Sequence, residues 1–525
     1  MSQLDSDVSA SPRLCGEKFV LAVDLGTGGP KVGLVSLAGR IAWEEHHAVA
    51  TRHLPGGGAV QDAEEWWRLI ADAARRGLAS GVVAREAIAA VSCTSQWASL
   101  VPVDAEGRPV GDCIMWQDRR GGRHARRRFG GWLGGYAPLA LARWIRRTGG
   151  APSPAGNDPI SHMLHLAHDA PEVHRAARWC LEPADYLTMR FAGAASASHA
   201  SMIAFWLTDN RRLDLLAYDP ALVRLAGIDA EKLPPLRPSA SIVGTVRDDV
   251  AAALGLPPGV PVVAGTSDLH SAAAGAGAVR EFETHMAVST TAWIGLPVPF
   301  KKSDLRRAIV SVPGLRPDRY LVANNHDTGG MCLRWLRENV LGPDLGYEAL
   351  TELAAGSAPG SGGVLFTPWL AGERSPVTDR RARAGFHNLS LATTRADMIR
   401  AVLEGVAYNN RWLHEAVERF AGRRLDPIRI IGGGARSDLW CQIHADVMDR
   451  TIERPAEPLH TNLRGAALIA ALALGAVRDD EVRALVPAER VFTPDPANRA
   501  AYDRLFAEFP RLYASQRAMF ARLNR

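Results

Sequence analysis

The chain has 525 residues, of which 47% are hydrophobic and 22% charged. This composition is typical of a folded protein of about two to three domains and excludes a disordered or collagen-like chain. The formal net charge of +5 is small for this length and implies no nucleic-acid partner. Six cysteines lack a CxxC or metal-type spacing, the first 17 residues lack an apolar signal core, and no run of about 18 apolar residues occurs. We therefore expect a cytoplasmic protein without disulfides or membrane contact.

The first half of the chain begins with three short apolar runs separated by glycine turns. These runs, at residues 18–24, 32–36 and 41–43, predict an antiparallel meander. Helical periodicity then begins at Asp62, and residues 88–92 are typical of a buried strand.

A similar order returns in the second half. Residues 260–265 indicate a strand that runs into a Thr-Ser-Asp turn, and residues 285–289 and 291–295 indicate strands that flank a Ser/Thr turn. A long amphipathic helix is expected at 397–420, and a strand at 428–431 that ends in three glycines. Two halves built alike predict a duplicated α/β unit with a cleft between the copies. We place the domains at 18–256 and 257–485, divided near a proline pair, with a helical extension at 486–525.

A glycine-rich loop follows the first strand. Glycines at Gly26 and Gly28 would let backbone N–H groups approach phosphate oxygens, while Thr27 and Lys31 add a hydroxyl and a cation. Asp24, at the strand end, could hold a phosphate-bridging Mg²⁺. The alternative is an ordinary hairpin turn.

Two other strand ends carry comparable residues. Asp268 precedes a helix of small residues and could accept a proton from a substrate hydroxyl, or it could serve only as the helix N-cap. Gly432, Gly433 and Gly434, with Ser437 after them, could admit a flat or anionic ligand, or they could form a plain loop. The spacing is not GxGxxG, which disfavours a dinucleotide site.

Trp116, Asp118 and Arg119 combine an aromatic face, a carboxylate and a guanidinium, the groups with which proteins bind sugars. A structural tryptophan beside surface charges is the alternative. Nine arginines between Arg119 and Asn157, with no acidic residue among them, indicate either an anion-binding region or a solvated helical face.

Together these segments resemble the FGGY family of carbohydrate kinases, and most closely its xylulokinase-like branch. The resemblance runs from about Phe19 to Gly475. The matching segments, in chain order, are residues 24–31, 94–97, 116–119, 183–186, 265–268, 289–291, 366–376 with its Gly-Glu-Arg-Ser-Pro sequence, 403–407 and 432–434.

The resemblance implies an α/β, two-domain, actin-like fold of duplicated ribonuclease-H type that binds ATP and a sugar. It implies that Asp268 is the catalytic base and that Asp24 acts through Mg²⁺. The residues implied to bind ATP are Gly26, Thr27, Gly28, Lys31, Ser289, Thr290, Thr291, Gly432, Gly433, Gly434 and Ser437. Those implied to contact the sugar are Gln96, Trp97, Trp116, Asp118, Arg119 and Asp185.

The chain departs from the family pattern at four places. Gly28 stands where Ser or Thr is usual, Ser289 where Gly is usual, and Ala184 where Lys is common. Trp97 begins the sequence Trp-Ala-Ser where xylulokinases commonly have Met-His-Gly. Loss of that histidine changes the contacts available to a sugar hydroxyl, on which discrimination between sugars depends.

The resemblance therefore implies a phosphotransferase acting on a hydroxyl of a pentulose or related polyol, with D-xylulose as the first candidate. Kinases for another ketose, a pentitol or a glycerol-like polyol are alternatives. A non-catalytic sugar- or nucleotide-sensing module on the same fold is a further alternative, and an actin-like filament is disfavoured because it leaves the Trp116 segment unexplained. We expect a small-molecule sugar as partner, and we leave open whether the chain forms a homodimer.

Overall fold

The first sheet is built around strand β1 (Phe19–Gly26), which is buried on both faces because nearly every residue in it is apolar. The computed structural model describes residues 16–524, and in it β1 pairs antiparallel with β2 (Gly29–Ser36) and parallel with β6 (Ile88–Ser95). Strand β3 (Ile41–His46) continues the antiparallel meander, as predicted. The absence of a signal segment was expected from the first 17 residues, and residues 1–15 lie outside the described part.

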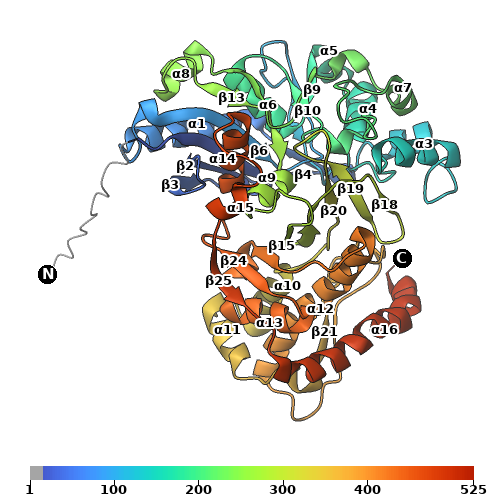
Figure 1. The fold of residues 1–525 in the computed structure, drawn as a ribbon. Helices are drawn as coiled ribbons and strands as arrows, with labels where there is room; N and C mark the ends of the chain where they lie inside the picture. The colour runs from blue at the N-terminus through green and yellow to red at the C-terminus, as the bar shows by residue number, and fades with distance from the viewer. Residues whose placement is uncertain (1–15, 525) are drawn as a thin grey trace.

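The remaining elements of the first half surround this sheet (Figure 1). Its small strands are β4 (Arg52–Leu54), β5 (Gly58–Gln61), β7 (Val101–Val103), β8 (Cys113–Ile114), β9 (Trp179–Leu181), β10 (Ala197–Ser198) and β11 (Leu236–Arg237), and β12 (Ile242–Thr245) lies at an edge of the main sheet. Its helices are α1 (Ala63–Ala79), α2 (Gly122–Phe129), α3 (Pro138–Thr148), α4 (Pro159–Asp169), α5 (Pro171–Ala176), α6 (Pro183–Ala192), α7 (Pro220–Ala226) and α8 (Asp248–Leu254).

The second half repeats the central pairing of the first. Strand β15 (Thr284–Val288) pairs antiparallel with β16 (Ala292–Gly295) and parallel with β23 (Ile428–Ile431), as β1 does with β2 and β6. Strand β24 (Ile452–Pro455) then adds in parallel beside β23. The predicted duplication of an α/β unit is confirmed.

The second half contains the following further elements. The strands are β17 (Pro297–Val298), β18 (Ser303–Asp304), β19 (Ile309–Pro313), β20 (Tyr320–Ala323), β21 (Leu365–Thr367), β22 (Gly385–His387) and β25 (Ala488–Phe492). The helices are α9 (Asp268–Gly275), α10 (Met331–Leu336), α11 (Tyr347–Ala355), α12 (Arg395–Ala421), α13 (Asp438–Met448), α14 (Thr461–Ala473), α15 (Val482–Leu485) and α16 (Arg499–Leu523).

The expected domain boundaries differ from the strand pairing at both ends. Strands β13 (Pro261–Val263) and β14 (Thr266–Ser267) pair parallel with β6, so the strand expected to open the second half completes the first sheet. A boundary at 256/257 therefore falls before the first sheet is complete, because strand partners and not the proline break decide the division. Residues 486–525 likewise contain β25, which pairs with β24, as well as the expected helix.

Helices α9 and α14 connect the two halves. Helix α14 lies late in the sequence but beside β1 and β6 of the first half, where Leu463 and Ala467 enter the core (Figure 1). A Cβ atom built on Gly275 of α9 would lie 1.8 Å from the carbonyl oxygen of Thr461, and one on Gly465 of α14 would lie 1.8 Å from that of Ser271. Only glycine allows the two backbones to approach so closely.

The other side of α9 packs on the second sheet. Ala272 of α9 and Ala276, which directly follows the helix, share a buried cluster with Ala287 of β15 and Ile431 of β23, and Trp293 of β16 packs against it. Small side chains let the helix fit between α14 and the strand ends. Helix α9 is therefore held from both halves.

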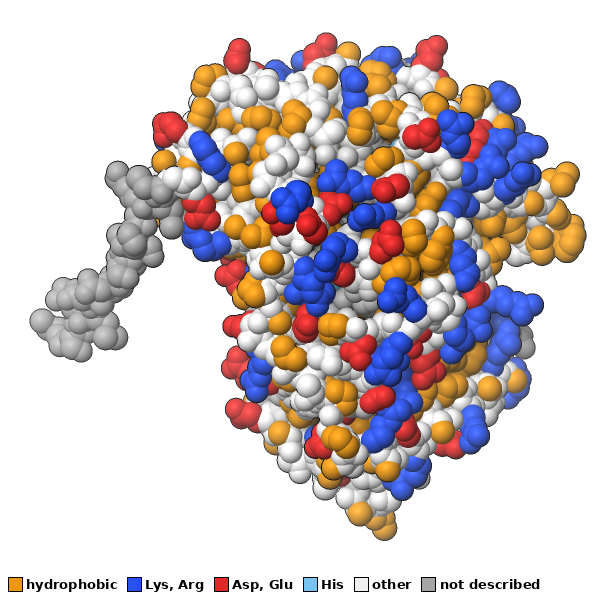
Figure 2. Space-filling view, in the orientation of Figure 1, with side chains coloured by type: hydrophobic (Ala, Val, Ile, Leu, Met, Phe, Trp, Pro, Cys, Tyr) orange, Lys and Arg blue, Asp and Glu red, His pale blue; other side chains and the backbone are white. Residues whose placement is uncertain are grey.

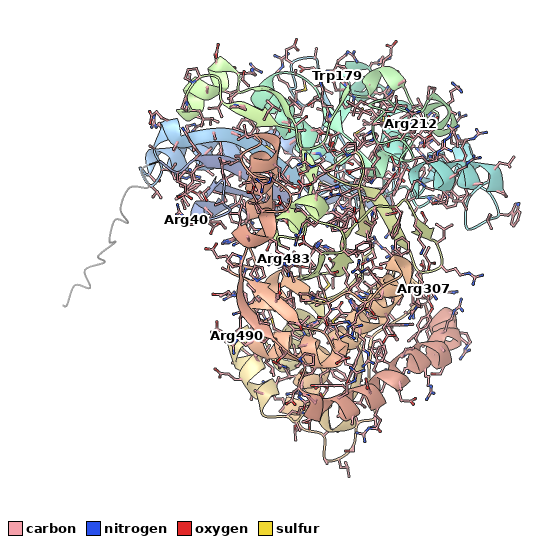
Figure 3. All side chains as sticks on the ribbon, viewed as in Figure 1. Arg40, Trp179, Arg212, Arg307, Arg483 and Arg490 are labelled. Carbon is pink, nitrogen blue, oxygen red and sulfur yellow. The ribbon has the colours of Figure 1, made fainter. Side chains whose placement is uncertain are left out.

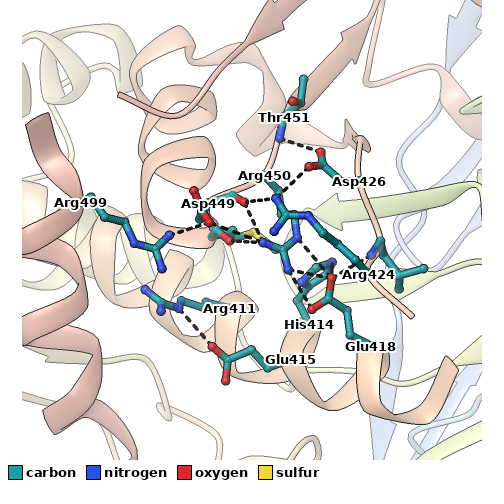
Figure 4. Close-up of polar contacts among 12 residues, drawn as sticks. Arg411, His414, Glu415, Glu418, Arg424, Asp426, Asp449, Arg450, Thr451 and Arg499 are labelled. Atoms are coloured by element: carbon teal, nitrogen blue, oxygen red, sulfur yellow. Dashed lines mark hydrogen bonds and ion pairs between the residues drawn. The ribbon is translucent and has the colours of Figure 1, made fainter. Parts of the chain in front are cut away.

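The C-terminal helix α16 is attached to the second half by ion pairs and aromatic packing. Arg411 of α12 pairs with Asp503 at 2.7 Å. Arg499 pairs with Asp449 at 2.9 Å, close to the Arg450–Glu418 pair at 2.8 Å (Figure 4). Tyr502, Phe509 and Phe520 are buried in the same core as Trp369. These contacts, together with those of Arg400 and Tyr408 to Tyr502, hold α16 against the body of α12.

Charged side chains of both signs are mixed over the visible surface (Figure 2). Arginines occur around both halves, and several of those labelled in Figure 3 pair with a nearby acid: Arg212 with Asp214, Arg483 with Glu453 and Arg307 with Asp304. Among residues 16–524 no helix is both long and apolar enough to cross a membrane.

We predict that Gly465→Ala lowers the free energy of unfolding by about 1–3 kcal/mol, because the added methyl group forces α9 and α14 apart. Urea denaturation followed by circular dichroism measures the change. Gly244→Ala is the matched control, since the nearest atom to a Cβ there is the Ala192 methyl at 3.5 Å. Equal stability of the two variants would contradict the close-contact argument.

Candidate active site

Three strands of the first sheet end side by side. In the parallel pairing, Thr94 of β6 lies between Asp24 of β1 and Thr266 of β14. The residues that follow these strands, including Thr27, Gln96 and Asp268, therefore emerge at one edge of the sheet. Ligands of α/β sheets bind at such carboxyl edges, which makes this edge the candidate site.

A chain of hydrogen bonds joins the first glycine-rich loop to the expected sugar segments. The Thr27 hydroxyl donates to Gln96 Oε1 at 2.6 Å and accepts from the indole N–H of Trp116 at 3.1 Å. The Thr27 carbonyl accepts from the amide of Gln61 at 2.9 Å. The structure thus brings Thr27, Gln96 and Trp116 together, and the Thr27 hydroxyl proton is already engaged by Gln96.

Asp24 and Asp268 form the acidic centre of this edge. Asp24 is 3% exposed, and its Oδ2 lies 3.3 Å from Lys31 Nζ. Asp268 stands in the first turn of α9 and keeps part of its surface accessible, while the N-cap residue of that helix is Ser267. Burial of its carboxyl and, secondarily, the Asp24 carboxylate raise the pKa of Asp268 to about 7. A carboxyl with a pKa near neutrality can accept a proton under physiological conditions.

The second sheet contributes a matching pair of loops. Because β15 and β23 are parallel and in register, Ser289 and Gly432 follow at the same edge. Gly432 has φ +88°, and a Cβ atom there would lie 2.4 Å from Ser289 Oγ. The N–H of Gly330 donates to the Ser289 carbonyl at 2.6 Å, and that of Gly329 donates to the Thr290 carbonyl at 2.9 Å. The loop 289–291 is thus fixed by backbone contacts on two sides.

Around the three glycines, one face is open. A Cβ atom on Gly433 would meet only Leu459, at 3.9 Å, and the Leu459 side chain is 44% exposed. Gly434 is closed by Val288 at 2.6 Å. Ser437 caps α13, where its hydroxyl oxygen accepts from the Trp440 amide at 3.2 Å. Gly433 and Leu459 therefore offer an open apolar surface, whereas the hydroxyl oxygen of Ser437 is bonded within helix α13.

Of the expected sugar residues, Asp118 and Asp185 are buried, whereas the side chain of Arg119 is exposed. The Asp118 carboxylate is completely buried and pairs with Arg120 at 2.7 Å instead of with Arg119. Burial opposes the ionisation of Asp118, but hydrogen bonds from Arg120 and from the Ala59 amide hold its pKa below the usual range. The backbone N–H of Arg119 donates to the Gly57 carbonyl, and its own carbonyl accepts from the Gly122 N–H, while its exposed side chain is not the partner of Asp118. Asp185 is completely buried, and burial raises its pKa well above the usual range. Local sequence could not distinguish Arg119 from its neighbour as the partner of Asp118.

The arginine-rich segment mainly makes structural contacts. Arg123 bonds Asp169, Arg147 bonds Asp219, and Arg126 and Arg128 donate to backbone carbonyls at Pro154 and Leu225. Exposed arginines of α2 and α3 (Arg127, Arg143, Arg146) add to the basic side chains near α3, at the upper right in Figure 2. These bonds are consistent with the solvated-face interpretation of the segment.

Two cavities lie away from the strand edge. One of about 40 Å³ lies behind α9 beside His270 and Leu315, and holds little more than water. The other, of about 740 Å³, lies on the outer side of the first half and includes Arg75, Arg190 and Arg247, each paired with an acid. Neither cavity is lined by Asp24 or Asp268. The candidate site is therefore located by the ends of the strands and by the raised pKa of Asp268.

Two sets of residues were not predicted as functional. Glu182 is completely buried and accepts from the N–H groups of Ala98 and Ser99 in the turn after β6. Glu373, from the Gly-Glu-Arg-Ser-Pro sequence, lies 3.1 Å from His326, whose backbone bridges to Ala292 directly after the loop 289–291. The adjacent glycines at 329–330 could have indicated from the sequence that the segment near His326 contacts the loop 289–291. No sequence pattern indicated Glu182.

The residues at the first edge are compatible with a Mg²⁺-nucleotide. Asp24 and Asp268 supply hard oxygen ligands, and a cation would relieve the repulsion between them, which adds to burial in raising the pKa of Asp268. Among the described residues, no group of three or more His, Cys, Asp or Glu could hold a metal ion. This pattern suits a cation that is held by one or two carboxylates together with substrate phosphates.

Comparisons with known proteins agree with this arrangement. Residues 19–275 match the model of the N-terminal domain of the FGGY family of carbohydrate kinases, and residues 260–474 match that of the C-terminal domain. A xylulose kinase of Staphylococcus epidermidis is 28% identical over 97% of this chain and 99% of its own, and a gluconokinase of Bacillus subtilis is 25% identical over 97% and 98%. The solved xylulose kinase of Rhodospirillum rubrum superposes with a TM-score of 0.81 at 28% identity, covering 96% of this chain and all of that one.

We predict that Asp268→Asn raises the thermal midpoint at pH 8 by about 1–3 °C and that this gain disappears near pH 4. The folded-state pKa of Asp268, about 7, exceeds its ordinary value of 3.8, so the wild type loses stability as pH rises between these values. Asparagine does not ionise and avoids this loss. Asp344→Asn, at an exposed aspartate, is the control for differential scanning calorimetry. A gain that is independent of pH would refute the electrostatic explanation.

Proposed function

The chain belongs to the FGGY family of carbohydrate kinases, and we propose that its two strand edges transfer the γ-phosphoryl group of ATP to a pentulose, with D-xylulose as the first candidate. The protein is a phosphotransferase with an alcohol group as acceptor, and it has the two-domain actin-like fold of sugar kinases. The proposal concerns the residues that perform the reaction and the sugar.

The observation that carries the proposal is the position of Asp268 beside Asp24. Asp268 lies at the shared edge of three parallel strands, with its pKa raised to about 7. Asp268 would accept the hydroxyl proton of the sugar as the oxygen attacks the γ-phosphorus and the bond to the β-phosphate oxygen breaks. The products are a sugar phosphate and ADP.

The glycine-bearing loops would hold the phosphates through backbone N–H groups. The loop 26–31 lies at the first edge with Asp268, and the loop 289–291 is fixed against Gly329, Gly330 and Gly432. Donors that do not move during the reaction stabilise developing charge most effectively. Mg²⁺, when bound through Asp24 and the phosphates, would supply positive charge for the transferring group.

The nucleotide base would lie on the side of Gly433, where the glycine and the exposed Leu459 form an open apolar surface. The sugar would lie at the first edge, near Gln96, Trp97 and Trp116. Relatives named xylulose kinase support a five-carbon ketose, and gluconokinases are the alternative within the family. A cytoplasmic location is proposed because the cysteines of the described residues are buried and unpaired, as is usual in a reducing compartment.

We predict that one acceptor from a panel of pentuloses, pentitols, hexuloses, gluconate and glycerol stimulates ADP release with Mg-ATP. Asp268→Asn should lower kcat by about 10²–10⁴-fold, because the proton acceptor is removed. Asp344→Asn is the matched control and should retain wild-type activity. Phosphate transfer to the sugar is verified by mass spectrometry of the product. Binding of Mg-ATP without turnover on any acceptor would favour the sensing module instead.

A further inference from the structure

The turn that follows strand β6 has an unfavourable backbone conformation. Ala98 has φ +63°, in the left-handed region where a residue with a Cβ atom costs about 1–2 kcal/mol. The N–H groups of Ala98 and Ser99 both point at one carboxylate, donating to Glu182 Oε1 at 3.1 Å and Oε2 at 3.2 Å. Within the described chain these two amides are its only hydrogen-bond donors. The Glu182 carboxylate therefore stabilises the strained conformation at Ala98.

Glu182 is an ionisable residue in a buried position, where carboxyl groups are uncommon. It is 1% exposed, and burial together with the neighbouring Asp185 and Asp268 carboxylates raises its pKa well above the usual range. A buried carboxyl group is costly unless hydrogen bonds satisfy it. Its two bonds to the turn are the contact that compensates for this cost.

Polar contacts also fix the residues on either side of Ala98, except for the side chain of Trp97. Ser99 Oγ accepts from the backbone N–H of Trp116 at 3.1 Å, and Gln96 is bonded to Thr27. The remaining large side chain, Trp97, makes no polar contact in the described structure and is partly exposed. It packs against a buried apolar cluster that includes Ile203, Leu269 and Ala273. Because Leu269 directly follows Asp268, the Trp97 indole lies on the acceptor side of the proposed base.

We propose that Glu182 is a positioning residue that holds Trp97 against Leu269, and that the Trp97 indole limits the length of the sugar accepted. The inference rests on the proposed function and deepens it by naming the substrate class: a neutral acceptor of about five carbons that places its C–H face on the indole. Aromatic faces bind the C–H faces of sugars while hydroxyls bond elsewhere. An added hydroxymethyl group would collide with the indole.

The first test changes the indole. Trp97→Ala and Trp97→Phe are compared with the wild type by kcat/KM for five-carbon and six-carbon ketoses at saturating Mg-ATP. Truncation should shift the ratio toward the six-carbon acceptor by about 10–200-fold, as expected for one carbon unit in a packed pocket, with the phenylalanine variant between. Trp132→Ala is the control, since that side chain is 83% exposed.

The second test separates positioning from folding. Glu182→Gln loses one of the two acceptors and should raise the KM for the five-carbon acceptor by about tenfold, while the KM for ATP stays unchanged. Ala98→Gly adopts positive φ without strain, so the double variant Ala98→Gly/Glu182→Gln should recover most of the lost acceptor affinity. Glu172→Gln, at an exposed glutamate, is the control.

The outcomes are distinct. If the wild type phosphorylates a sugar but Trp97→Ala leaves the acceptor ratio unchanged, the length limit is refuted. If Glu182→Gln behaves like Glu172→Gln, or if glycine at 98 fails to rescue it, the positioning role is refuted. If the wild type phosphorylates no acceptor, the proposed function itself fails. A shifted ratio together with rescue by glycine supports both parts.

Discussion

The contact between helices α9 and α14 is the constraint on which the rest of the molecule depends. At Gly275 and Gly465 the two backbones lie so close that a methyl group on either would overlap a carbonyl oxygen. Helix α14 packs on β1 and β6, and α9 packs on the ends of β15 and β23 through alanines. The close approach therefore joins the two sheets and places the first turn of α9, with Asp268, between them.

The acidic centre illustrates how function and stability oppose each other in this fold. Asp24 and Asp268 are brought together although their charges repel, and burial and, secondarily, this repulsion raise the pKa of Asp268 to about 7. A carboxyl group so perturbed is a poor structural residue and an effective proton acceptor. By contrast, the loop 289–291, which we propose binds phosphate, is held by backbone hydrogen bonds from Gly329 and Gly330.

On the proposed sugar side of the site, some residues can contact a ligand and others orient their neighbours. Asp118 is satisfied by Arg120 and the Ala59 amide, and Glu182 by two amides of the turn after β6. The Thr27 hydroxyl links Gln96 to Trp116. This bonding leaves the partly exposed faces of Trp97 and Trp116 for a ligand. The xylulokinase-like motif at residues 116–119 is therefore partly a structural motif.

The sequence by itself determined the elements and the family. The meander of β1 to β3, the Ser/Thr turn after β15 and the glycine-rich loops were all predicted, because alternating apolar residues and glycine turns act on neighbouring residues along the backbone. Only the tertiary structure decided that β13 completes the first sheet, that Arg120 rather than Arg119 pairs with Asp118, that Asp185 is buried, and that Glu182 holds the turn at Ala98. These outcomes join residues far apart in sequence or choose between neighbours. They depend on strand register and packing, which no local pattern specifies.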